Sequence, residues 1–148
     1  MKDVQTAIPQ IAAFLVFFPL LWMSTCWLIS RLSGWSSLAR SFETDQPAVG
    51  ETFFPASGRV RLFSSYQNCL KVSVSEEGVR VATVMFFKSG HRPLFFPWES
   101  VDRLEQRRNF FGSTSTLLVS ARGRTWRIAL FGGRLYARLA KYAAPHVD

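Results

Sequence analysis

The sequence predicts a mainly β protein, in which a seven-strand antiparallel barrel or sandwich with a C-terminal capping helix follows one transmembrane helix. Three observations predict this fold class. Residues 8–29 form an uncharged run of mostly large apolar side chains. Beyond about Arg59, apolar and polar residues alternate in short runs separated by turn residues, which is the period of strands. The segment 134–143 carries apolar residues at helical spacing.

The apolar run of residues 8–29 is long enough to cross a bilayer. Its roughly 22 residues make a helix of about 33 Å, against a hydrocarbon core about 30 Å thick. Pro9 lies near the helix start, where its missing N–H costs little, and Pro19 is expected to kink the span. Trp27 and Trp35 follow toward the C-terminal end, where we expect them to anchor the helix in the membrane interface.

A cleaved signal peptide is the alternative interpretation of the N-terminus. The apolar run is longer than a usual signal core, Asp3 offsets the charge of Lys2, and no small-x-small cleavage pattern follows. A retained anchor is therefore the prediction. Arg31 and Arg40 give the C-terminal flank a small excess of basic residues, which favours a cytoplasmic C-terminal domain at the cell (inner) membrane.

Residues 30–50 are expected to connect the anchor to the β domain. Within this connector, Trp35, Leu38, Ala39 and Phe42 recur at the spacing of one helix face. The stripe predicts a short amphipathic helix, which lies either on the lipid interface or on the domain. Docking on the domain is the simpler interpretation.

Residues 51–148 are expected to form the β domain with its C-terminal helix. The alternation favours strands around Val60 and Leu62 and over 70–74, 79–87, 94–96, 101–108, 116–121 and 125–131. In the closing helix, Leu135, Leu139 and Tyr142 form the stripe expected to be buried. Pro97 ends a strand because it has no N–H for the ladder, so Trp98 is expected to cover one mouth of the barrel.

The order of seven strands and a closing helix resembles the pleckstrin-homology-like (PH-like) fold. Residues 90–101, GHRPLFFPWESV, contain a segment of the form hydrophobic-Pro-aromatic-x-x-hydrophobic that is similar to small bacterial PH-like and GRAM-like domains. The preceding hairpin, SEEGV at 75–79, and the Gly34-Trp35 element of the connector are also similar to membrane-anchored members. The resemblance covers roughly residues 33–142. It implies a binding or scaffolding module without an established enzymatic activity.

The chain is strongly basic, with a formal net charge of +8, and all of its charged residues except Lys2 and Asp3 follow the apolar run. Such a domain attracts anionic headgroups when it is held at a bilayer, and it also suits nucleic acid or an acidic protein. The outward strand positions and hairpin tips supply the candidate lipid- or partner-binding residues: Arg59, Arg61, Lys71, Arg103, Arg107, Arg108, Arg122 and Arg124. Phe110 and Phe111, at one tip, either insert into the interface or belong to the core.

Neither a metal-ligand spacing nor a phosphate loop is evident in the sequence, and we expect no enzyme activity, cofactor or metal. His91 lies in a Gly/Pro loop and is expected to occupy a surface turn. The acidic residues Glu99, Asp102 and Glu105 are interleaved with arginines, which favours surface ion pairs over a paired-carboxylate site.

These observations predict a single-pass, membrane-anchored adaptor that docks on anionic lipid or on a membrane-protein partner. A membrane-tethered nucleic-acid-binding domain is the alternative. It is disfavoured because the aromatic residues lie mainly in apolar runs and are not interleaved with arginine on one face. A tethered enzyme with an unrecognised site is a further alternative.

Overall fold

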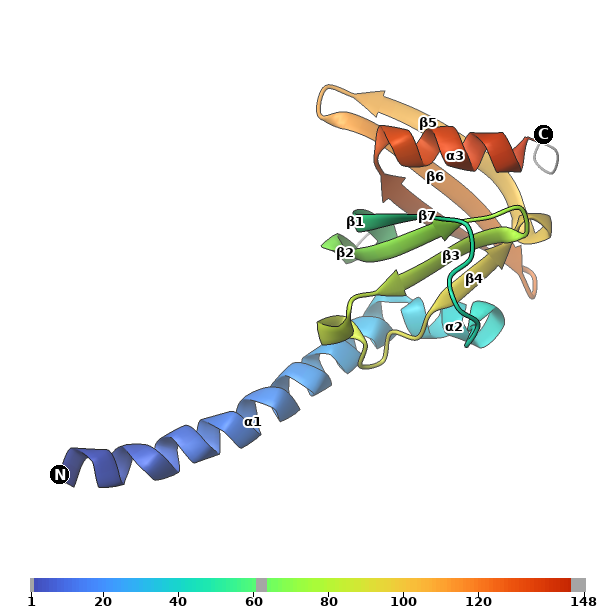
Figure 1. Ribbon diagram of the computed structural model, residues 1–148. Coiled ribbons are helices and arrows are strands. Elements are labelled where there is room, and N and C mark those ends of the chain that lie inside the picture. The colour runs from blue at the N-terminus through green and yellow to red at the C-terminus, as the bar shows by residue number, and fades with distance from the viewer. Residues whose placement is uncertain (1, 61–63, 145–148) are drawn as a thin grey trace.

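The computed structural model describes residues 2–60 and 64–144, which contain three α-helices and seven strands (Figure 1). The long helix α1 covers Lys2–Ser33 and the short helix α2 covers Trp35–Phe42. Between them Gly34 has φ 83°, a left-handed conformation that glycine adopts without a steric penalty. This residue lets the chain turn sharply from one helix into the next.

The strands form one antiparallel sheet in the order β4-β3-β2-β1-β7-β6-β5. Their bounds are β1 Glu51–Val60, β2 Ser64–Val74, β3 Gly78–Thr83, β4 Leu94–Pro97, β5 Val101–Asn109, β6 Gly112–Ala121 and β7 Arg124–Phe131. The mainly β class with seven antiparallel strands is therefore confirmed. In the described part of the chain the edge strands β4 and β5 do not pair, so the sheet is open and is not a closed barrel.

Four strand boundaries differ from the sequence prediction. β2 begins at Ser64 and not at 70, and β6 begins at Gly112 and not at 116. β1 begins at Glu51, well before Arg59, because its first half pairs with β2 through register shifts that disrupt the alternation of apolar residues. The predicted third strand over 79–87 is wrong in its last part. β3 ends at Thr83, and Met85–Phe87 form a 3-10 turn, η1. The expected position of Leu62 lies outside the described residues.

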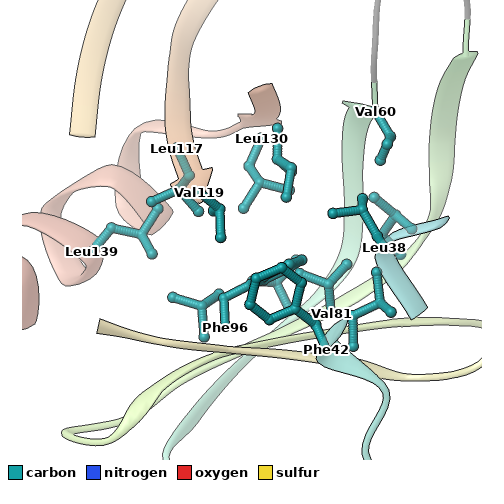
Figure 2. Packing of buried hydrophobic residues seen from close by; sticks show 14 of the residues in the cluster. Leu38, Phe42, Val60, Val81, Phe96, Leu117, Val119, Leu130 and Leu139 are labelled. Carbon is teal, nitrogen blue, oxygen red and sulfur yellow. The ribbon is translucent and has the colours of Figure 1, made fainter. Parts of the chain in front are cut away.

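The core lies between the two halves of the bent sheet. Figure 2 shows Leu117, Val119 and Leu130, from β6 and β7, opposite Val81 and Phe96 of β3 and β4. The helix α3 (Gly133–Ala143) buries one face in this core through Leu135, Leu139 and Ala143. The helix α2 docks on the domain as expected, and its core residues are Trp35, Leu38 and Phe42.

Trp98 is buried at the end of β4, but the open sheet formed by the described residues has no barrel mouth for it to cover. This residue begins the short turn η2 (Trp98–Ser100), which joins β4 to β5, and its side chain is buried. Its indole N–H donates a hydrogen bond to the Ser75 carbonyl across 3.0 Å. The turn between β4 and β5 is thereby tied to the turn between β2 and β3.

The helix α1 projects away from the domain (Figure 1). Its segment Asp3–Ser33 contains an 18-residue window with a mean hydropathy of 2.0, and the segment is long and apolar enough to cross a membrane. The helix continues through Pro9 and Pro19 and extends beyond the predicted residues 8–29 at both ends.

Candidate membrane interface

The last part of α1 belongs structurally to the domain. Cys26, Ser30 and Ser33 are buried, although neighbouring residues such as Leu28 and Leu32 are exposed. The spacing of the three buried residues places them on one helix face, because positions three and four apart lie above one another. Their small side chains allow the domain to approach the α1 backbone closely.

The loop between β3 and β4 is the segment that lies along this face of α1. The Trp22 indole N–H donates a hydrogen bond to the Phe86 carbonyl across 2.8 Å, and the Ser30 hydroxyl donates to the Gly90 carbonyl. Gly90 has φ +73°, and a Cβ there would lie 3.1 Å from the Trp27 Cα. Glycine is therefore required for both its backbone conformation and its close approach to the helix.

A buried polar network joins α1, β2 and the same loop. The Tyr66 hydroxyl lies 3.0 Å from the Ser33 hydroxyl and 3.0 Å from His91 Nε2, and His91 Nδ1 lies 3.1 Å from the Ser89 carbonyl. His91 is 2% exposed, so its predicted place in a surface turn is wrong. The loop folds back against α1. The imidazole packs edge-on against the Trp35 ring, with 5.2 Å between the ring centroids.

We expect this network to make the domain less stable in mild acid. Burial lowers the pKa of His91, and the hydrogen bond to Ser89 opposes that shift only partly. A histidine in an unfolded chain titrates near about 6.5. The stability conferred by the neutral imidazole is therefore present above that pH and is lost as the pH falls below it.

Thermal unfolding of the full chain in detergent at pH 7.5 and pH 5.0 tests this expectation. The wild type should lose stability at pH 5.0, and His91→Gln should remove much of that difference while lowering stability at pH 7.5. An unchanged pH dependence in His91→Gln would show that another group is responsible.

Apolar side chains are exposed at two places on the side of the domain from which α1 leaves. In η1, Met85 is 81% exposed and Phe86 is 75% exposed. At the turn between β5 and β6, Phe110 and Phe111 are 99% and 98% exposed, so they do not belong to the core. In Figure 1, η1 lies beside α1 at the lower left, the β5–β6 turn lies at the upper left at the other edge of the sheet, and the β6–β7 turn lies at the right.

Phe86 also helps to line an apolar cup of about 280 Å³ against α1, together with Phe18, Pro19 and Trp22. Trp22 also packs against Phe87, with ring centroids 5.5 Å apart and ring planes inclined by 51°. The η1 turn is thus held against α1 by both a hydrogen bond and aromatic packing.

The predicted basic residues that lie within 2–60 and 64–144 are exposed, but they do not form one patch. Arg107 and Arg108 pair with Thr114 and Ser113 beside the β5–β6 turn, whereas Arg122 and Arg124 lie at the other end of β6. The ten residues of β6 span about 30 Å. One flat surface at the β5–β6 turn therefore does not also reach the β6–β7 turn.

The remaining basic candidates are dispersed as well. Arg103 lies within the sheet and pairs with Glu105 at 3.5 Å. Arg59 faces solvent opposite Ser65, and Lys71 is exposed about 20 Å further along β2. The predicted candidate Arg61 lies outside the described residues.

The two predicted interfacial tryptophans have different environments. Trp35 is 0% exposed, and its indole N–H donates to the Arg92 carbonyl across 2.9 Å, so its prediction as an interface anchor is wrong. Trp27 is 50% exposed, with the Arg31 guanidinium 4.7 Å from its ring centroid, as an interfacial residue would be. The sequence prediction missed Met85 and Phe86 because they were assigned to a strand.

No protein-family model matches the chain, and no curated protein matches its sequence. The function of the chain is therefore inferred from the geometry of α1, the β3–β4 loop and the β5–β6 turn. Among the described residues, no group of three or more His, Cys, Asp or Glu side chains is arranged to hold a metal ion.

Proposed function

We propose that the chain is a single-pass membrane protein whose β domain is a PH-like binding module that docks on anionic lipid headgroups. The burial of Ser30 and Ser33 against the domain carries this proposal. These residues belong to the same unbroken helix as the apolar segment that precedes them. The helix therefore continues from the domain surface into the segment suited to lipid, without a flexible linker.

The same packing supports a retained anchor over a cleaved signal peptide. Cleavage beyond Ser30 would remove Cys26 and Ser30 from their buried positions, and with them the hydrogen bond between Ser30 and Gly90. A signal peptide that is cleaved off makes no lasting contact with the folded domain, so its surface does not need to be complementary to that domain. The complementarity of α1 to the β3–β4 loop is expected of a permanent part of the fold.

The β5–β6 turn supplies the groups for lipid docking. Arg107 and Arg108 are exposed, and neither forms an ion pair within the described part of the chain. Guanidinium groups bind phosphate through paired hydrogen bonds, and each basic residue near an anionic surface contributes about 1 kcal/mol. The adjacent Phe110 and Phe111 suit the boundary between headgroups and hydrocarbon.

The flanking charges support a cytoplasmic domain at the inner membrane. Arg31 follows the apolar segment directly, and Lys88 lies exposed in the loop beside α1. Both add to the positive charge on the C-terminal flank, which is the flank retained in the cytoplasm by the positive-inside rule.

Reversing two charges at the β5–β6 turn tests lipid docking. In Arg107→Glu/Arg108→Glu, the loss of two contributions of about 1 kcal/mol each corresponds to roughly a 30-fold loss of affinity for anionic lipid. Native mass spectrometry of the full chain, released from nanodiscs of mixed phosphatidylglycerol and phosphatidylcholine, measures the retained phosphatidylglycerol.

Arg122→Glu/Arg124→Glu is the matched control, because it makes the same change of charge at the opposite end of β6. This variant should retain phosphatidylglycerol as the wild type does. Equal losses in the two variants would indicate diffuse attraction, and no loss in either would remove lipid docking at this turn.

A further inference from the structure

The helix α1 is longer than the hydrocarbon core of a bilayer. Its segment Asp3–Ser33 has 31 residues, which is a length of about 46 Å. The hydrocarbon core is about 30 Å thick, and the bilayer with its headgroups is about 40–45 Å thick. A stretch of about 16 Å, or roughly 11 residues, must therefore lie outside the hydrocarbon.

The packing indicates which end of α1 lies outside. The buried residues of the helix are all in its C-terminal part, where Cys26, Ser30 and Ser33 face the domain. The distance along the helix from Trp22 to Ser33 is about 16 Å. The segment from Val4 to Trp22, about 19 residues, is then about 28 Å long and matches the hydrocarbon core.

The β3–β4 loop lies beside the segment that is outside the hydrocarbon. Its first contact is the hydrogen bond from Trp22 to Phe86, and its last is the hydrogen bond from Ser30 to Gly90. The loop therefore follows α1 for about 12 Å, which is more than the roughly 5–8 Å depth of one headgroup layer, so its first part lies in that layer and its last part lies in the water beyond it. No rotation of the whole domain moves Phe86 away from Trp22, because this contact is fixed within the fold.

We infer that the first part of the β3–β4 loop is embedded in the headgroup layer and that Met85 and Phe86 insert at the boundary of this layer with the hydrocarbon. This inference rests on the proposed function in one respect, namely that α1 spans a membrane. The high exposure of Met85 and Phe86 fits this position, since both side chains are apolar and point away from the core. Lys88, two residues further along the chain, lies where phosphates would surround it.

This insertion makes a second contact with lipid beside the helix and fixes the orientation of the domain. It also changes the boundary of the span, which ends near Trp22 and not at Ile29. Trp22 then occupies the interface, where tryptophan is enriched, and its indole N–H is already satisfied by the Phe86 carbonyl.

Spin labels on the full chain in phosphatidylcholine nanodiscs test the inference. The label is attached at Met85→Cys or Phe86→Cys in a Cys26→Ala/Cys69→Ala background, since both native cysteines are free thiols. Collision rates with oxygen and with a water-soluble nickel complex report depth. The Trp22 contact survives the Phe86 exchange because it uses the backbone carbonyl. A neutral lipid is chosen so that the result does not depend on the docking of arginines.

Phe14→Cys, in the middle of α1, and Arg122→Cys, at the far turn, are the reference positions. We expect the ratio of oxygen to nickel accessibility at 85 and 86 to approach that at 14 and to exceed that at 122 several-fold. A lipid-shielded label at 14 with water-exposed labels at 85 and 86 would overturn the inference alone. A water-exposed label at 14 would overturn the membrane span and the inference together.

Discussion

Two arginines in the middle of α1 are expected to release the protein from the membrane. Leu15 and Val16 are each 65% exposed and make no contribution to the domain core. An arginine near the centre of a spanning helix costs about 2.5–3.5 kcal/mol on insertion scales, so Leu15→Arg/Val16→Arg costs about 5–7 kcal/mol. The measurement is the distribution of the full chain between pellet and supernatant after carbonate washing of membranes.

The control places one added arginine outside the span. Val49 is 64% exposed in the connection between α2 and β1, and Val49→Arg should leave the protein in the pellet. If the double-arginine variant also stays in the pellet after carbonate washing, lipid insertion of α1 is not what retains the protein.

Replacing Trp35 with alanine is expected to cause the largest loss of stability among single substitutions in the α1–domain junction. The ring is fully buried and packs edge-on against Tyr66 at 5.4 Å and His91 at 5.2 Å between centroids. Truncation of a buried tryptophan costs about 3–5 kcal/mol, and here the Arg92 carbonyl also loses its indole donor. Denaturant unfolding of the full chain in detergent measures the change.

Trp27→Ala is the comparison for this prediction. Trp27 is half exposed and contacts Arg31 on the surface of α1, and exposed substitutions usually change stability by less than about 0.5 kcal/mol. Equal losses in the two variants would mean that Trp35 does not hold the junction together.

The strands and helices that have a clean periodicity were predictable from the sequence. The strand β7 and the helix α3 match their predicted positions within one residue, because one face of each is buried and the other is solvated, whereas β6 begins four residues before its predicted start. The first half of β1 was not predicted, since its register shifts interrupt the alternation on which the prediction depends. The end of β3 was missed because Met85, Phe86 and Phe87 have the composition of a strand.

The junction between α1 and the domain was not predictable from local patterns. Trp22 and Phe86 are 64 residues apart in the sequence, and Ser33 and Tyr66 are 33 apart. Ser30 and Ser33 resemble the polar end of an apolar span, and only the packing shows that they are buried. His91 lies in a Gly/Pro loop, and the folding of that loop against α1 was not visible in its composition.

For the predicted basic residues, the sequence indicated which side chains are exposed better than which of them share a surface. The alternation of apolar and polar residues correctly predicted that Arg59 and Lys71 are exposed. The two hairpin tips lie at opposite ends of β6 because one turn precedes this strand and the other follows it; the sequence prediction treated their arginines as one set, although two consecutive hairpins imply this separation. Which arginines share a surface is a property of the topology.

The most direct test of the account is the intact mass of the protein that remains in carbonate-washed membranes. We predict a membrane-bound chain that retains α1, with the 16.8 kDa of the full sequence, because the end of that helix is packed into the domain. A shorter soluble protein that begins beyond Ser30 would contradict the account, since the protein would then have no membrane span and no helix to hold the β3–β4 loop at the membrane.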